Sequence, residues 1–204
     1  MKHAASRELY AYWEQKRGTR SAPERADIEP GAIRSVLSDA FILALDGAAH
    51  YPIRLAGTRV CALFDRELKG EAFVDLWSTP SRSIVTSLLA ILADECTGTV
   101  AGVTAENDAG DCLDLELLLL PLGTRRPSFA RAIGVLAPIK LPSWLGTHPV
   151  GALTLGSRRH VGAALEKRIL PRFMAPRGRR TLTVYDGGRA TLGDSGGPGT
   201  SRPR

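Results

Sequence analysis

The chain has 204 residues and a mass of 21.9 kDa, the size of one ordinary domain or of a smaller domain with extensions, and its 44% hydrophobic and 24% charged residues exclude a fully disordered protein. Its net charge of +6 is concentrated towards the end: residues 1–155 carry 16 basic and 18 acidic side chains, whereas residues 156–204 carry 11 and 3. A nucleic-acid groove on the main fold is therefore disfavoured, because binding to phosphates needs basic residues there.

The first predicted element is an amphipathic helix over residues 5–17, whose apolar side carries Leu9, Tyr12 and Trp13. A short second helix is predicted from Pro30. The apolar side of the first helix needs cover, either from the chain's own sheet or from a second copy of the chain. The sequence leaves both alternatives open, and the second predicts a homodimer or a protein partner bound through this helix.

Five segments with the pattern of strands follow, two before a run of helices and three after it. They are residues 41–45, 51–55, 99–106, 112–120 and 129–137. Between them, residues 57–77 predict short helical turns, and Thr79 with Pro80 starts one long helix that continues through Cys96 until Gly98 stops it. This order predicts an α+β fold, a five-stranded antiparallel sheet with helices on one face.

The predicted organisation has three parts: an N-terminal helical cap over residues 1–38, a sheet domain over residues 39–157 and a basic, Gly/Arg-rich extension over residues 158–204 that is partly disordered. Within the sheet domain, Gly134 indicates a close approach or a bulge.

The three cysteines, Cys61, Cys96 and Cys112, are widely spaced and contain no CxxC pair. The sequence therefore predicts neither a disulfide framework nor a metal site. No apolar stretch approaches the ~20 residues that span a membrane, and the first residues lack the apolar core of a leader. We therefore expect a cytoplasmic protein that does not contact a membrane.

Residues 193–198 read Gly-Asp-Ser-Gly-Gly-Pro, the nucleophile segment of chymotrypsin-like serine proteases. That chemistry needs a histidine oriented by a buried aspartate and oxyanion donors held by surrounding strands. The glycine-rich surroundings of Ser195 cannot build such a frame, so the motif is interpreted as part of a low-complexity tail. No catalytic residue is predicted.

Several short motifs and their order resemble PAS sensor domains and, among these, the short single-PAS-domain proteins of alphaproteobacteria. The motifs are Tyr-Trp at 12–13 with Arg-Gly at 17–18, Pro-Glu-Arg-Ala-Asp-Ile-Glu-Pro at 23–30, Arg-Leu-Ala-Gly-Thr at 54–58, Glu-Leu-Lys-Gly at 67–70, Trp-Leu-Gly at 144–146 and Leu-Thr-Leu at 153–155. The likeness extends over residues 8–157.

This resemblance implies a small cavity between the sheet and its overlying helices, used for ligand sensing or for protein contacts. The candidate ligand-binding residues are Arg54, Thr58, Phe64, Phe73, Trp77 and Leu115. The apolar members of this set equally fit a filled core, Arg54 a solvated strand position and Thr58 a helix cap. Cys61 lacks the Asn-Cys-Arg-Phe context of flavin-binding light sensors, and no histidine is placed as a haem ligand, so the cofactor is left unspecified.

The sequence thus predicts a non-enzymatic sensory, signalling or protein-interaction module of bacterial PAS type that binds a small apolar ligand or a protein partner. The alternative is a regulatory protein that binds nucleic acid or assembles a complex through its basic tail.

Overall fold

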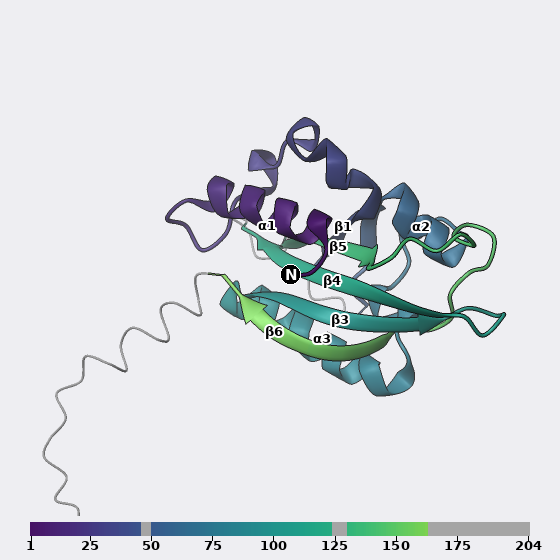
Figure 1. Ribbon diagram of the computed structural model, residues 1–204. Coiled ribbons are helices and arrows are strands. Elements are labelled where there is room, and N and C mark those ends of the chain that lie inside the picture. The colour runs from purple at the N-terminus through teal and green to yellow at the C-terminus, as the bar shows by residue number, and fades with distance from the viewer. Residues whose placement is uncertain (46–49, 124–129, 163–204) are drawn as a thin grey trace, which may run out of the picture. The chain divides into compact units, whose positions relative to one another are not determined.

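The computed structural model describes residues 1–45, 50–123 and 130–162. Its central element is an antiparallel sheet of six strands in the order β2-β1-β5-β4-β3-β6 (Figure 1). The strands are β1 (Ala40–Ala44), β2 (Ile53–Ala56), β3 (Gly98–Glu106), β4 (Cys112–Leu122), β5 (Arg131–Pro138) and β6 (Thr154–Val161). All five predicted strands are present, and the 193–198 motif lies outside the described residues.

The sixth strand corrects the five-stranded prediction. β6 pairs with β3 and forms one edge of the sheet, and the predicted domain boundary at residue 157 falls inside it. Its exposed residues, Gly156 to Arg159, lack the apolar alternation by which a strand is recognised in a sequence. The strand exists because β3 offers it a row of backbone hydrogen-bonding partners.

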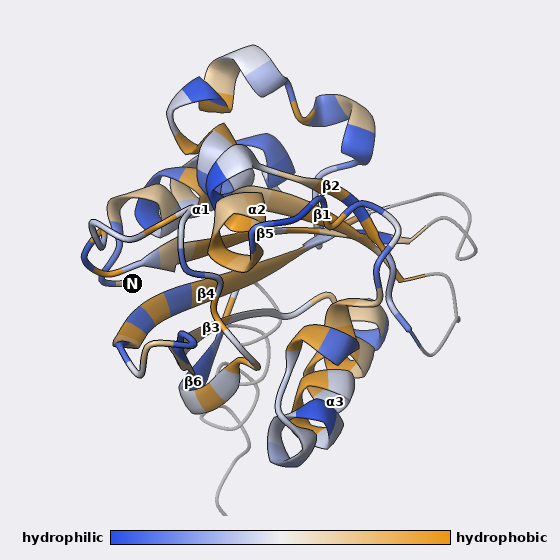
Figure 2. Ribbon diagram, turned by 90° about the vertical axis from the view of Figure 1, so that its right-hand side faces the viewer, coloured by the Kyte–Doolittle hydropathy of each residue, from blue (hydrophilic) through white to orange (hydrophobic). Residues whose placement is uncertain are grey.

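Helices cover both faces of the sheet, which corrects the prediction of helices on one face (Figure 2). The outer face, as we call it, carries α1 (Ala4–Arg17) and the 3-10 helix η2 (Pro30–Asp39), which are joined through η1 (Arg25–Asp27). The inner face carries α2 (Thr58–Phe64), η3 (Phe73–Leu76) and α3 (Thr79–Glu95).

The leucine run of β4 explains why both faces are covered. Leu115, Leu117 and Leu119 pack in the inner core, whereas Leu118 and Leu120 pack in the outer core. Because successive side chains of a strand point to opposite faces, an apolar run of this length requires cover on both sides.

α1 packs on the chain's own sheet, which is one of the two alternatives that the sequence left open for covering its apolar side. Leu9 and Trp13 are fully buried there, and the Trp13 indole N–H donates a hydrogen bond of 2.8 Å to the Pro121 carbonyl. The Tyr12 hydroxyl accepts from the Glu29 N–H at 2.9 Å, so it ties α1 to the linker before η2. Leu9 and Trp13 are therefore unavailable to a second chain in this arrangement, and homodimerisation stays a prediction.

α3 begins with Pro80 in its first turn, as predicted, but it ends earlier than predicted. Its last residue is Glu95, and Cys96 adopts a left-handed conformation with φ of 51°. Gly98 instead opens β3, where a Cβ atom would approach Leu120 Cδ2 to 2.9 Å. The glycine thus serves strand packing rather than helix termination.

Candidate functional site

Four of the six predicted site residues come together in the core beneath the inner face. Phe64 of α2, Leu115 of β4, Phe73 of η3 and Trp77, which follows η3, all belong to one buried apolar cluster. The rings of Phe73 and Trp77 meet edge to face with their centroids 5.8 Å apart. We call these four residues the inner cluster.

Trp77 carries an unsatisfied polar group within the inner cluster. Its side chain is fully buried, and its indole N–H has no hydrogen-bond partner among the described residues. A buried donor without a partner costs about 1–3 kcal/mol, so such groups are uncommon in folded proteins. Trp77 is thus a fixed donor in otherwise apolar surroundings, which suits one acceptor atom of a mainly apolar molecule.

Arg54 and Thr58, the two polar candidates, lie outside this cluster. Arg54 is exposed on the edge strand β2, and Thr58 is exposed at the first position of α2. The N-cap of α2 is Gly57 rather than Thr58. A ligand-binding role for these two side chains stays a prediction.

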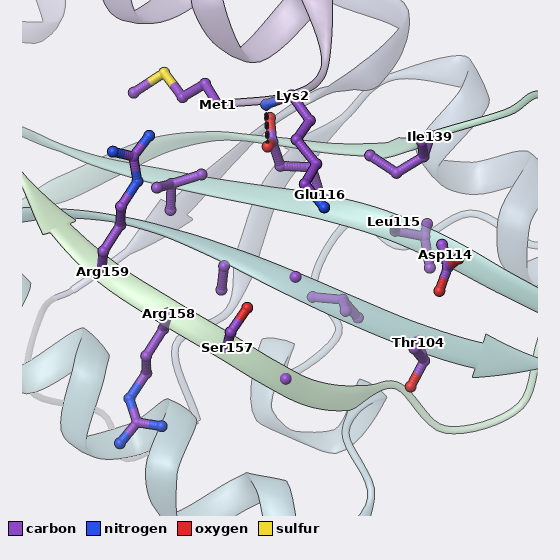
Figure 3. A pocket seen from close by; sticks show the side chains of 15 residues that line it. Met1, Lys2, Thr104, Asp114, Leu115, Glu116, Ile139, Ser157, Arg158 and Arg159 are labelled. Carbon is purple, nitrogen blue, oxygen red and sulfur yellow. Dashed lines mark hydrogen bonds between the residues drawn. The ribbon is translucent and has the colours of Figure 1, made fainter.

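A second concave region, which the sequence did not predict, lies on the outer face. It has a volume of about 660 Å³ and is formed by β3, β4, β6 and the residues before α1 (Figure 3). We call it the outer hollow. Its lining residues are Met1, Lys2, Val100, Ala101, Gly102, Val103, Thr104, Asp114, Leu115, Glu116, Ile139, Gly156, Ser157, Arg158 and Arg159.

Glu116 anchors the start of α1 beside this hollow. Its two carboxylate oxygens accept hydrogen bonds from the backbone N–H groups of Lys2 at 2.6 Å and His3 at 3.0 Å. Burial alone would raise the pKa of the Glu116 carboxyl, but these bonds and the neighbouring Ser6 hydroxyl stabilise the ionised form and hold the pKa below its ordinary 4.5. The carboxylate also suits the positive end of the helix dipole.

We expect Glu116→Gln to lower the free energy of unfolding by about 1–3 kcal/mol at neutral pH, because the amide supplies one acceptor instead of two. The pKa of Glu116 is lower in the folded state than in the unfolded state. Its contribution to the stability of the fold is therefore complete at a pH above the unfolded-state pKa and is lost as the pH falls through the folded-state pKa. The difference in stability between wild type and variant should therefore shrink on acidification below about pH 4.5. Urea denaturation over a pH series measures this difference. Asp114→Asn, an exposed control on the same strand, should cost little, and a pH-independent difference would contradict the anchor.

The described residues contain no group of three or more His, Cys, Asp or Glu side chains that could hold a metal ion. No helix in the described part of the chain is both long and apolar enough to cross a membrane.

A family model described as a PAS domain matches residues 1–137. Similar solved structures include a LOV protein from Rhodobacter sphaeroides, with 12% identity, a TM-score of 0.42 and coverage of 54% of this chain and 66% of that chain. The PAS domain of an HTR-like protein from Haloarcula marismortui has 14% identity, a TM-score of 0.39 and coverage of 53% and 89%. An RNA-binding light-oxygen-voltage receptor has 18% identity, a TM-score of 0.41 and coverage of 57% and 35%, so only about a third of that receptor is represented. Among curated proteins, none matches the chain.

Proposed function

Starting from the premise that this chain belongs to the PAS domain family, we propose that it is a non-enzymatic sensory module whose inner cluster binds a small, mainly apolar molecule. PAS domains are generally sensory or signalling modules and usually lack catalytic activity. The motifs at residues 54–58 and 67–70 support its assignment to the short single-PAS-domain type.

The unpartnered indole N–H of Trp77 carries the proposal. It implies a ligand with an apolar body and one acceptor, such as a carbonyl or ether oxygen, that satisfies this donor. Leu115 and Phe73 supply apolar side chains in the same buried core. No second polar group of the inner cluster competes for the acceptor, so orientation depends on this single bond.

Ligand entry requires the inner cluster to open, because its four side chains are packed together in the core. The elements that border it are short: α2 has 7 residues and η3 has 4. Helices of this length depend on tertiary packing, so they can rearrange at lower cost than the sheet. Ligand binding would then shift the population between a closed and an open arrangement of this segment.

Native mass spectrometry of the purified chain tests the proposal. We expect the wild type to retain a small molecule. Trp77→Phe, which keeps an aromatic ring but removes the donor, should raise the dissociation constant of that molecule at least about tenfold, which corresponds to about 1.4 kcal/mol, and should therefore retain less of it. Trp144→Phe is the matched control, since Trp144 is only partly buried at the edge of the same core. A wild type that appears only as the bare chain, even after incubation with a bacterial small-molecule extract, contradicts the proposal.

A further inference from the structure

The outer hollow exists because two glycines face each other across β3 and β6. A Cβ atom at Gly156 would lie 3.1 Å from the Gly102 carbonyl, at a point where the register of the two strands shifts. Gly102 is exposed, and a Cβ atom there would meet only Ser157, at 3.7 Å. The floor of the hollow at this point is therefore backbone beside a serine hydroxyl.

Three cationic residues line the hollow without a carboxylate partner among the described residues: Lys2, Arg158 and Arg159. Arg159 stands opposite Val100 and its side chain extends towards the start of α1, whereas the side chain of Arg158 runs away on the other side of β6 (Figure 3). The Lys2 side chain lies over the sheet between the start of α1 and β6. Glu116 accepts from the backbone N–H groups of Lys2 and His3 and, among the described residues, forms no ion pair with Lys2 or Arg159.

The opposite end of the hollow is apolar. Ile139 is 39% exposed there, and Leu141, two residues further along the chain, is 63% exposed. Exposed aliphatic side chains next to a concave surface are typical of protein contact sites. The hollow thus has Arg159 at one end and Ile139 with Asp114 at the other, and Lys2 lies over the sheet between them (Figure 3).

We propose that the outer hollow docks a short acidic and apolar peptide segment of a partner protein. A carboxylate of the segment lies between Lys2 and Arg159, within reach of the Ser157 hydroxyl, and an aliphatic side chain lies against Ile139. The absence of a side chain at Gly102 allows the peptide backbone to approach β3. This interaction uses side chains on the outer face, so its test needs no ligand in the inner cluster.

The charges favour a peptide over a nucleic acid. Asp114 lies on the same face of β4 as Glu116 and is exposed at the apolar end, where it would repel the next phosphates of a polyanion. A second copy of the chain fits less well, because α1 covers β4 and β5 beside the hollow and keeps another sheet from lying flat on this face (Figure 1). A narrow extended segment avoids both obstacles.

Nitrogen-15 NMR titration of the full chain tests the proposal with a blocked pentapeptide that contains one glutamate, one leucine and otherwise alanine. We expect saturable shifts of the Gly102, Ser157 and Arg159 amides with a dissociation constant of about 1 mM or tighter. Arg159→Glu should raise that constant at least about tenfold, the effect of reversing one close charge contact. Lys69→Glu makes a comparable charge reversal at an exposed position that does not line the hollow, and it should leave the constant unchanged. Gly102→Leu, which fills the floor without altering charge, should also weaken binding.

Four results would overturn the proposal. They are no saturable shift in the wild type, equal binding by the Arg159→Glu variant, equal binding of a control peptide in which lysine replaces glutamate, and equal binding of a single-stranded pentanucleotide. Shifts that appear on raising the protein concentration alone would instead identify a second copy as the occupant. The dispersion of each variant's spectrum reports whether it is folded.

Discussion

Gly57→Ala should destabilise the domain by about 3 kcal/mol or more, at or above the usual upper range for overpacking a core. A Cβ atom at this position would lie 2.1 Å from the Leu37 carbonyl oxygen and 2.4 Å from the Ser38 carbonyl oxygen. Both contacts are with backbone, which cannot rotate away as a side chain can. The Gly57 N–H also donates to the Ala40 carbonyl at 2.8 Å, so the strand and the helix start cannot separate without losing that bond.

Gly31→Ala is the matched control, because no atom lies within 4 Å of a Cβ atom placed there. Gly57 has φ of −71°, an ordinary value for any residue, so the expected loss comes from space alone and not from backbone strain. Guanidinium denaturation of both variants measures the two costs. A Gly57→Ala protein as stable as Gly31→Ala would mean that η2 and α2 are not held this closely.

The same junction carries an ion pair between a buried aspartate and a partly exposed arginine. Asp39, at the end of η2, is almost fully buried and accepts two hydrogen bonds from the Arg59 guanidinium of α2, at 2.8 and 2.9 Å. A buried carboxylate needs such a partner, since its desolvation is otherwise uncompensated. The close approach at Gly57 and this ion pair together fix the angle at which α2 enters the inner core.

The sequence predicts those elements whose side chains alternate or repeat clearly. The inward leucines of β4, the proline-started α3 and the early hairpin of β1 and β2 follow from their apolar periods and turn residues. The grouping of Phe64, Phe73, Trp77 and Leu115 depends on tertiary packing and was anticipated only through the resemblance to PAS domains.

Other features have no local signal. β6 is polar and exposed, and only its pairing with β3 makes it a strand. Glu116 looks like an ordinary outward charge of an alternating strand, yet it is buried because the start of α1 folds over it. The motif at residues 54–58 contains Gly57, but the reason for a glycine there is a carbonyl from residue 37, which no local pattern reveals.

β4 connects the two proposed sites. Leu115 faces the inner cluster and the adjacent Glu116 faces the outer hollow, where it holds the start of α1. A rearrangement of the inner cluster that displaced β4 would therefore act on the anchor of α1 and on the position of Lys2 in the hollow. This is a physical route by which a ligand in the core would change the affinity for a peptide on the outer face.

Trp13→Glu should prevent stable folding of the domain, because this tryptophan is internal rather than a contact for a second chain. Removing a buried tryptophan costs about 3–5 kcal/mol, and an unpaired carboxylate in its place adds a further penalty. That loss is comparable with the ~5–15 kcal/mol that stabilises a typical domain. The Pro121 carbonyl would also lose the indole N–H that it accepts at 2.8 Å.

Circular dichroism and size-exclusion chromatography separate this outcome from the alternative, in which the apolar side of α1 contacts a second chain. Ala11→Glu is the matched control, since it adds the same charge at an exposed position of α1 and should leave both measurements unchanged. An aggregated or unfolded Trp13→Glu chain supports the packing of α1 on its own sheet. A folded monomeric Trp13→Glu protein derived from a dimeric wild type would show the opposite: that the apolar side of α1 belongs to an interface between chains.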